Sequence, residues 1–127
     1  MTDTQRLEFR PTLHLAPAAA PAEQFQNETL RPLAKQQHDL LVAAFQLFLK
    51  KRKVNFNAIA TTKRFDKVKE LVARDNRLRG LLFGIVVGGF TRAEMNYYIE
   101  NEGEVNRRLT NLLTERLLEV ARQKPAL

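Results

Sequence analysis

Histidine and cysteine are among the side chains most often used for catalysis and metal binding, and this chain has few of them. Its 127 residues include no cysteine and two histidines, His14 and His38. The lack of cysteine excludes a disulfide framework, a thiolate zinc site and a cysteine nucleophile. A carboxylate-bridged di-metal bundle requires paired Glu-x-x-His motifs, and the residue three positions before His38 is Lys35. We therefore expect no metal, no cofactor and no catalytic residue, and we interpret His38 as a half-buried helix residue.

Glycines could also do chemistry, by cradling a phosphate group. Gly80, Gly84 and Gly88 are spaced four residues apart and would share one face of a helix. A phosphate-binding loop needs a lysine followed by serine or threonine after its last glycine, and that sequence does not follow here. We interpret these glycines as positions of close helix packing or as helix ends.

The basic residues are concentrated in one part of the chain. The whole sequence has 21 Lys and Arg against 14 Asp and Glu, a net charge of +7. Residues 50–79 hold eleven basic and three acidic side chains, a net charge of +8, so the rest of the chain sums to −1. Such a segment can contact a polyanion, or it can be a solvated helix face whose charges pair at i,i+4. The candidate polyanion contacts are Lys50, Lys51, Arg52, Lys53, Lys63, Arg64 and Lys67.

Helices must position these residues. Apolar side chains recur at three- and four-residue intervals, which predicts helices over 23–53, 62–74, 75–87, 91–101 and 104–122. Pro32 is tolerated in a first helical turn, so the regular part of the first helix can alternatively begin at about Leu30. One continuous helix over 62–87 is the alternative to two. The predicted fold is all-α, a compact irregular bundle of five or six helices that forms a single domain over residues 23–127.

Capping residues mark several of these boundaries. Thr91 followed three residues later by Glu94 is the sequence pattern of a capping box, in which each residue bonds to the backbone of the other. Asp75 is the expected N-cap of the 75–87 helix. Thr61 or Thr62 is expected to cap the helix before it.

Residues 1–22 differ from the rest of the chain. Apolar side chains fall at alternate positions on both sides of a proline, a pattern typical of an interrupted strand: Leu7, Phe9, Leu13 and Leu15. The alanine- and proline-rich stretch 16–22 favours a semi-rigid extended linker. We therefore predict an extended N-terminal arm and linker over 1–22. The arm is either a mobile tail or a segment that packs on its own domain or on a partner subunit.

Two stretches of the sequence resemble a known family. Glu23-Gln24-Phe25-Gln26-Asn27-Glu28-Thr29-Leu30-Arg31-Pro32 and Gly88-Gly89-Phe90-Thr91 are similar to a small all-helical bacterial family, mostly from Bacteroidetes, and the likeness covers most of the chain after the arm. The resemblance implies a helical fold and no particular mechanism. Some members bear the label glyoxalase. Glyoxalases hold metal ions with histidine and glutamate ligands on βαβββ modules or in His-rich dinuclear sites, so the two histidines here give that label no support.

These features favour a non-enzymatic helical domain that acts by association, with itself or with a protein partner. The alternative is electrostatic binding of nucleic acid through residues 50–79, and the third is an enzyme of unidentified chemistry. Residues 1–8 are polar and lack the apolar run of a secretory signal, and the longest apolar run, 80–90, is too short for a membrane span. We therefore expect a basic cytoplasmic protein with no membrane partner.

Any binding to nucleic acid is expected to be weak, salt-sensitive and carried by residues 50–79, because contacts to phosphates release counterions. Reversing the four cations 50–53 to glutamate should abolish binding of labelled duplex and single-stranded oligonucleotides at low salt. Reversing Arg107 and Arg108 should matter little, since acidic neighbours offset them. A helix-turn-helix built from the 91–101 and 104–122 helices predicts the opposite ranking of the two variants.

Overall fold

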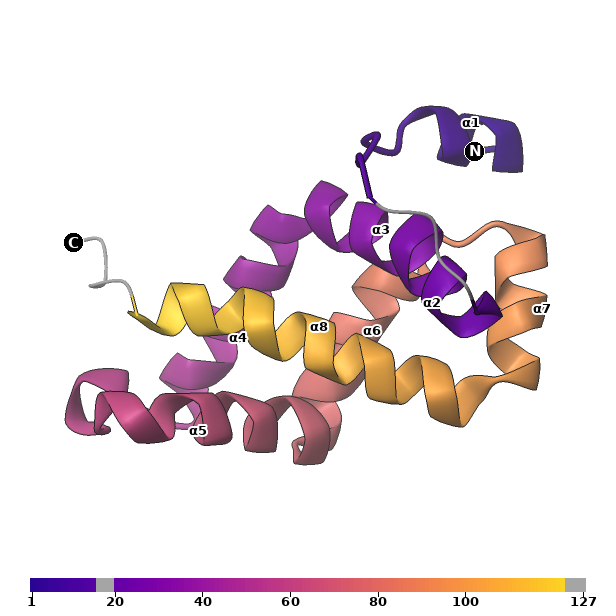
Figure 1. Cartoon of the computed structure of the whole chain (residues 1–127). Coiled ribbons are helices and arrows are strands. Elements are labelled where there is room, and N and C mark those ends of the chain that lie inside the picture. Colours follow the sequence, from indigo (N-terminus) through magenta and orange to yellow (C-terminus); the bar gives the residue numbers. More distant parts are fainter. Residues whose placement is uncertain (16–19, 123–127) are drawn as a thin grey trace.

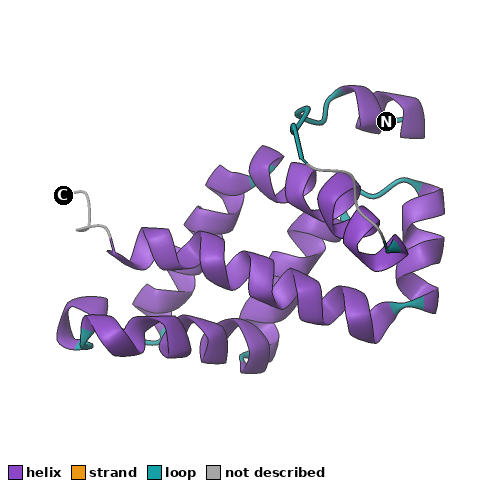
Figure 2. Ribbon diagram, viewed as in Figure 1, coloured by secondary structure: helices purple, strands orange, loops and turns teal. Residues whose placement is uncertain are grey.

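The described part of the chain is built from helices. The computed structural model describes residues 1–15 and 20–122, and no strand occurs within these ranges (Figures 1 and 2). The α-helices are α1 (Asp3–Glu8), α2 (Pro21–Phe25), α3 (Arg31–Gln36), α4 (His38–Lys51), α5 (Thr61–Arg74), α6 (Asn76–Val87), α7 (Arg92–Glu100) and α8 (Glu102–Arg122). A π-helical segment, Gln26–Leu30, joins α2 to α3, and a 3₁₀ turn, Phe56–Ala58, precedes α5. The predicted compact all-α fold is confirmed.

The long helix α8 contacts more of the other elements than any other helix in the described ranges. It lies alongside α5 and also contacts α4, α7 and the π-helical segment (Figure 1). Its apolar side chains recur every three or four residues, so they line one side of the helix. Four of them are at most 2% exposed: Val105, Leu109, Leu113 and Leu117. Helices α4 and α6 pack against each other and complete the core.

The helix predicted over 23–53 is divided in the structure, so the single-helix prediction is wrong. Pro32 has no N–H group, so it cannot donate to the carbonyl four residues earlier. At the preceding residue, the Arg31 N–H bonds to the carbonyl of Gln26, five residues back, which is the π-helical pattern. The chain thus widens into a π turn ahead of the proline. The helix then ends at Gln37, whose backbone angles (φ −97°, ψ 14°) leave the helical region. The apolar spacing continues across both features, which is why periodicity does not reveal them.

The boundary between α5 and α6 lies at Asp75. Its backbone is extended (φ −78°, ψ 102°), and its Oδ1 accepts a hydrogen bond from the Leu78 N–H at 3.2 Å. The chain therefore forms two helices here, as the first of the two alternatives predicted. At the start of α5, the N-cap is Ala60 and no side chain caps the helix. The predicted cap at Thr61 or Thr62 is wrong, because the helix already includes Thr61.

The N-terminal arm is partly helical, which corrects the extended prediction. Helix α1 opens with a capping box in which Thr2 Oγ1 accepts from the Gln5 N–H at 3.1 Å and Gln5 Oε1 accepts from the Thr2 N–H at 2.8 Å. The alternating apolar residues have no neighbouring strand to pair with, so local capping decides the conformation. Helix α2 begins at Pro21, inside the predicted linker. Ala20 is the N-cap of α2, and residues 16–19 of that linker lie outside the described residues.

Helix α4 ends in a Schellman motif that has lysine at the position usually held by glycine. The Val54 N–H bonds to the Leu49 carbonyl at 2.9 Å, and the Lys53 N–H bonds to the Lys50 carbonyl at 3.2 Å. Lys53 has φ 55°, and no other non-glycine residue in the described ranges has a positive φ. A side chain in this left-handed region costs roughly 1–2 kcal/mol because Cβ crowds the following carbonyl.

We expect Lys53→Gly to stabilise the protein by about 0.5–1 kcal/mol. Removal of Cβ relieves the crowding, and the added freedom of the unfolded chain offsets part of that gain. Lys50→Gly is the matched control, because the same change inside α4 should destabilise by about 0.5–1 kcal/mol. Chemical denaturation measures both values, and a destabilised Lys53→Gly would contradict the prediction.

Candidate functional site

The groups most often used for metal chemistry do not converge in the part of the chain that the structure describes. There, no three histidine, aspartate or glutamate side chains are placed to hold one metal ion. None of the helices there is long and apolar enough to cross a bilayer. His38 is half-buried, and its Nδ1 lies 3.1 Å from Nη1 of Arg116. The candidate sites are therefore surfaces and clusters of charge.

Two of the seven candidate polyanion contacts are engaged with their own chain. Arg52 Nε donates to Asp75 Oδ2 at 3.0 Å, and this hydrogen bond holds the pKa of Asp75 below its ordinary value. Arg64 Nε donates to the Ile59 carbonyl at 3.1 Å, which turns that guanidinium toward the loop before α5. Each of these two arginines therefore keeps only part of its guanidinium for an external anion.

The other candidate contacts lie in two separate places. The Arg52–Asp75 pair fixes the end of α4 beside the end of α5, so residues 50–53 lie at that end. Lys63 precedes Asp75 by twelve residues, which is about 18 Å along a helix. Lys67 lies one helical turn closer to Asp75 than Lys63 does. The structure thus spreads the predicted basic surface along α5 instead of collecting it into one site.

A groove between α4 and α6 combines basic and apolar side chains. Its volume is about 490 Å³. We call it the α4–α6 groove, and it is lined by Leu47, Phe48, Lys51, Arg52, Asn76, Arg77, Gly80 and Leu81. No acidic side chain lines it. Apolar side chains and cations line the groove together, a combination that complements an amphipathic and acidic surface.

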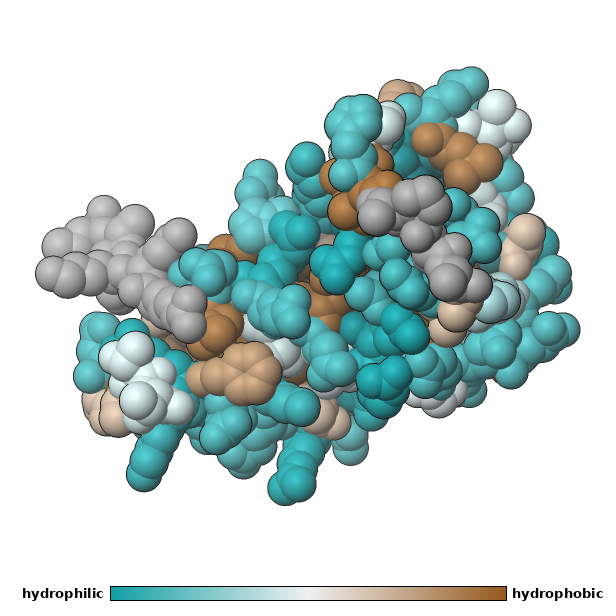
Figure 3. Space-filling view, viewed as in Figure 1, coloured by the Kyte–Doolittle hydropathy of each residue, from teal (hydrophilic) through white to brown (hydrophobic). Residues whose placement is uncertain are grey.

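The apolar side chains of this surface are open to solvent. Leu47 is 46% exposed and Leu81 42%, and Leu40, two turns before Leu47 on α4, is 58% exposed. A Cβ atom added to Gly80 or Gly84 would have no neighbouring atom within 4 Å, so the α6 backbone is open to close approach by a partner there. The face that carries α8, in contrast, is mainly hydrophilic, with small apolar patches between α5 and α8 and beneath the arm (Figure 3). Periodicity placed Leu81 on an apolar stripe but did not reveal that this part of the stripe is uncovered.

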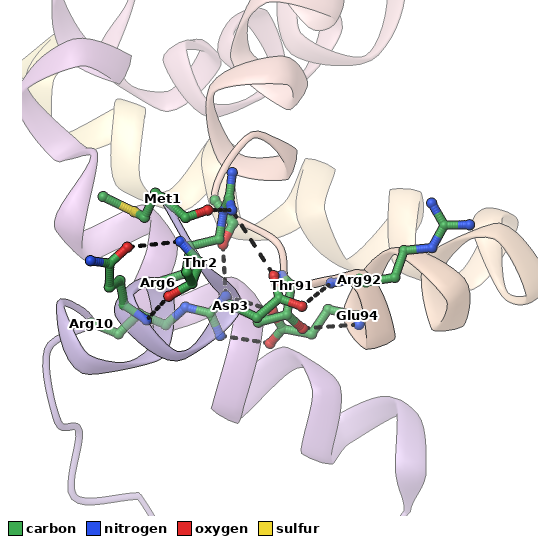
Figure 4. Close-up of polar contacts among 10 residues, drawn as sticks. Met1, Thr2, Asp3, Arg6, Arg10, Thr91, Arg92 and Glu94 are labelled. Carbon is green, nitrogen blue, oxygen red and sulfur yellow. Dashed lines mark hydrogen bonds and ion pairs between the residues drawn. The ribbon is translucent and has the colours of Figure 1, made fainter.

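Charged contacts anchor the N-terminal arm to the body. Arg10 Nη1 donates to Glu94 Oε2 at 2.6 Å, and its Nη2 donates to Glu94 Oε1 at 2.5 Å and to the Gly89 carbonyl at 2.8 Å. The Arg92 N–H donates to Asp3 Oδ2 at 3.1 Å, which ties α1 to the start of α7 (Figure 4). No side chain of α1 is buried, so these polar contacts, with little apolar packing, hold the helix in place.

Glu94 is the centre of this anchor. Its N–H bonds to Thr91 Oγ1 at 3.2 Å and its Oε1 accepts from the Thr91 N–H at 2.8 Å, so the capping box forms. Thr29 Oγ1 donates to Oε2 at 2.6 Å. The side chains of Arg10 and Glu94 are only 6% and 15% exposed. Burial alone would raise the pKa of Glu94, but the hydrogen bonds from Arg10, Thr29 and Thr91 outweigh it and lower that pKa below 4.5.

Glu94→Gln should lower the free energy of unfolding at pH 7 by on the order of 1–3 kcal/mol, since it leaves the buried Arg10 charge without its carboxylate. Because the folded-state pKa is depressed, the stabilisation is complete above about pH 4.5 and is lost as the pH falls through the folded-state pKa. The difference between wild type and Glu94→Gln should therefore shrink on acidification. Glu104→Gln is the control, because Glu104 pairs with arginines at an exposed position and should matter far less. A pH-independent difference in denaturation curves would contradict this prediction.

Comparison of the chain with protein-family models, with curated proteins and with solved structures gave no match. The resemblance to a Bacteroidetes-type family stays a prediction, and the geometry of the chain is the basis of the function proposed next.

Proposed function

We propose that the protein is a helical association module whose α4–α6 groove receives an acidic amphipathic helix of another protein. The observation that carries the proposal is the groove itself, which has an exposed leucine on each wall and cations among its lining residues. This choice follows the first sequence-based hypothesis, association, and specifies the partner's chemistry.

The exposed apolar side chains in and beside the groove favour a helix as the occupant. Leu40 and Leu47 are seven residues apart, so they extend along one side of α4 over two turns. Leu81 lines the groove across from Leu47, on α6, where Gly80 leaves the backbone accessible. A partner helix with apolar residues at i, i+3, i+4 and i+7 would bury these leucines, and each fully buried leucine contributes about 1.5–3 kcal/mol.

The positive charge of the groove lining favours an acidic partner over a second copy of the chain. Lys51 and Arg77 lie on opposite walls of the groove, and Arg52 adds a third cation whose charge is partly offset by Asp75. Two copies that met through this groove would bring the same cations together, and like charges oppose association. Glutamate or aspartate beside the apolar face of a partner helix would complement them and speed the encounter.

Nucleic-acid binding through residues 50–79 remains the alternative proposal. It would use cations 50–53 and would leave the leucines of the groove without a role. The two proposals therefore differ in which substitutions abolish binding, which makes them separable in one experiment.

The test uses a fluorescein-labelled synthetic helix with leucines at i, i+3, i+4 and i+7 and glutamates on its flanks, followed by fluorescence anisotropy. We expect saturable binding that weakens with salt, and a loss of at least about tenfold in affinity for the double variant Leu47→Ser/Leu81→Ser. Ile99→Ser is the matched control, since Ile99 is an exposed apolar residue of α7 outside the groove. A peptide of the same composition in scrambled order should bind more weakly.

Several results would overturn the proposal. The proposal fails if the peptide does not bind at low salt, or if the scrambled peptide binds as tightly as the designed one. It also fails if Ile99→Ser weakens binding as much as Leu47→Ser/Leu81→Ser does. Oligonucleotide binding that survives Leu47→Ser/Leu81→Ser but fails on reversal of residues 50–53 would favour the nucleic-acid alternative. Light scattering that shows a dimer disrupted by the leucine substitutions would make a second copy the occupant.

A further inference from the structure

A second hollow, which we call the α8 cleft, lies between the π-helical segment and α8. Its volume is about 320 Å³. Gln26 and Arg31 line it at the two ends of the π-helical segment, and Arg107, Arg108, Asn111 and Glu115 line it from one side of α8. The α8 residues recur at three- and four-residue steps, so they project from the same side of the helix. No local sequence pattern reveals this site, because Arg31 and the α8 arginines are more than seventy residues apart.

The arginines of the α8 cleft are only partly neutralised. One carboxylate, that of Glu104, pairs with both Arg107 and Arg108, at 2.8 Å in each case. Arg108 Nη1 also donates to Gln26 Oε1 at 2.8 Å, which holds that guanidinium in place. The side chain of Arg31 makes no hydrogen bond or ion pair with any described residue. Its guanidinium is therefore available to a ligand.

A fourth arginine adds to the excess of positive charge. Arg116 lies near Arg31, and burial together with the charge of Arg31 lowers the pKa of Arg116. Its Nε is buried without a hydrogen-bond partner among the described residues, and its Nη1 faces the ring of His38. The four arginines and the two carboxylates, Glu104 and Glu115, leave this region with a net charge of +2. An anion bound here would offset charge that the described part of the fold leaves uncompensated.

We propose that the α8 cleft binds the phosphate group of a small ligand, held between Arg31 on one wall and the Arg107–Arg108 pair on the other. A phosphate monoester carries about −1.5 to −2 charge at pH 7 and three strong acceptor oxygens, which match the local charge, the guanidinium of Arg31, and the N–H groups that Arg107 and Arg108 do not use on Glu104 and Gln26. A ligand with a single carboxylate would offset only half of the net charge of +2 in this region. Asn111 provides an uncharged polar group at the cleft wall. The site shares no residue with the α4–α6 groove and does not depend on it.

The test titrates inorganic phosphate and, separately, phenyl phosphate into the protein at constant ionic strength. Nitrogen-15 NMR follows the backbone amides and the arginine Nε–H signals. We expect saturable shifts centred on Arg31, Arg107 and Arg108, and at least about tenfold weaker binding by Arg31→Gln. Arg92→Gln is the matched control, because Arg92 is an exposed arginine of α7 outside the cleft. Melting curves of both variants establish that they remain folded.

The two ligands distinguish the sources of the phosphate. Tighter binding of phenyl phosphate indicates a phosphorylated small molecule, and equal binding indicates the phosphate ion itself. The proposal is overturned if sodium chloride alone produces the same shifts, if the shifts do not saturate, or if Arg31→Gln and Arg92→Gln bind equally.

Discussion

Burial of the apolar side of α8 is the interaction on which the rest of the structure depends. The remaining helices have at most 14 residues each, near or below the length at which an isolated helix is stable in water. They persist because they pack on one another and on α8, the longest helix among the described residues. Val68 and Val72 of α5 are fully buried in the same core as Leu113 and Leu117 of α8. Loss of this contact would leave short helices with little to hold them.

The same packing creates the two surfaces to which we assign binding. A helix that carries apolar residues on more than one side can cover only the side that faces the core, and α4 therefore leaves Leu40 and Leu47 open beside α6. The polar side of α8, opposite its buried stripe, meets the π-helical segment and encloses the α8 cleft. The wide turn next to Pro32 thus lies at the edge of a candidate site, as π turns often do.

The N-terminal arm is attached in a different way from the rest of the fold. Apolar burial is non-directional, whereas the pair of hydrogen bonds between Arg10 and Glu94 fixes both the position and the orientation of the arm. Glu94 also caps α7 through Thr91, so one carboxylate links the arm to the start of that helix. Leu7 and Phe9 stay exposed because this anchor, and not hydrophobic packing, determines where the arm lies.

The sequence alone determined what depends on residues within about four positions of one another. Helical periodicity predicted α5 to α8 to within a few residues, and short-range capping patterns placed Asp75 and the Thr91–Glu94 box at helix starts. The concentration of basic charge in 50–79 is likewise a property of the sequence. Local patterns were insufficient where two of them competed. In α1 a capping box competes with strand-like apolar alternation, and at the π turn Pro32 competes with helical apolar periodicity.

Only the tertiary structure decided which surfaces are covered and which distant side chains meet. Periodicity indicates that a side of a helix is apolar but not whether a neighbour covers it, so the exposure of Leu81 could not be predicted. Arg10 meets Glu94, and Arg31 approaches Arg116, across more than eighty residues of chain. No local pattern encodes such a pair, because the distance between its members is set by how all the intervening helices pack.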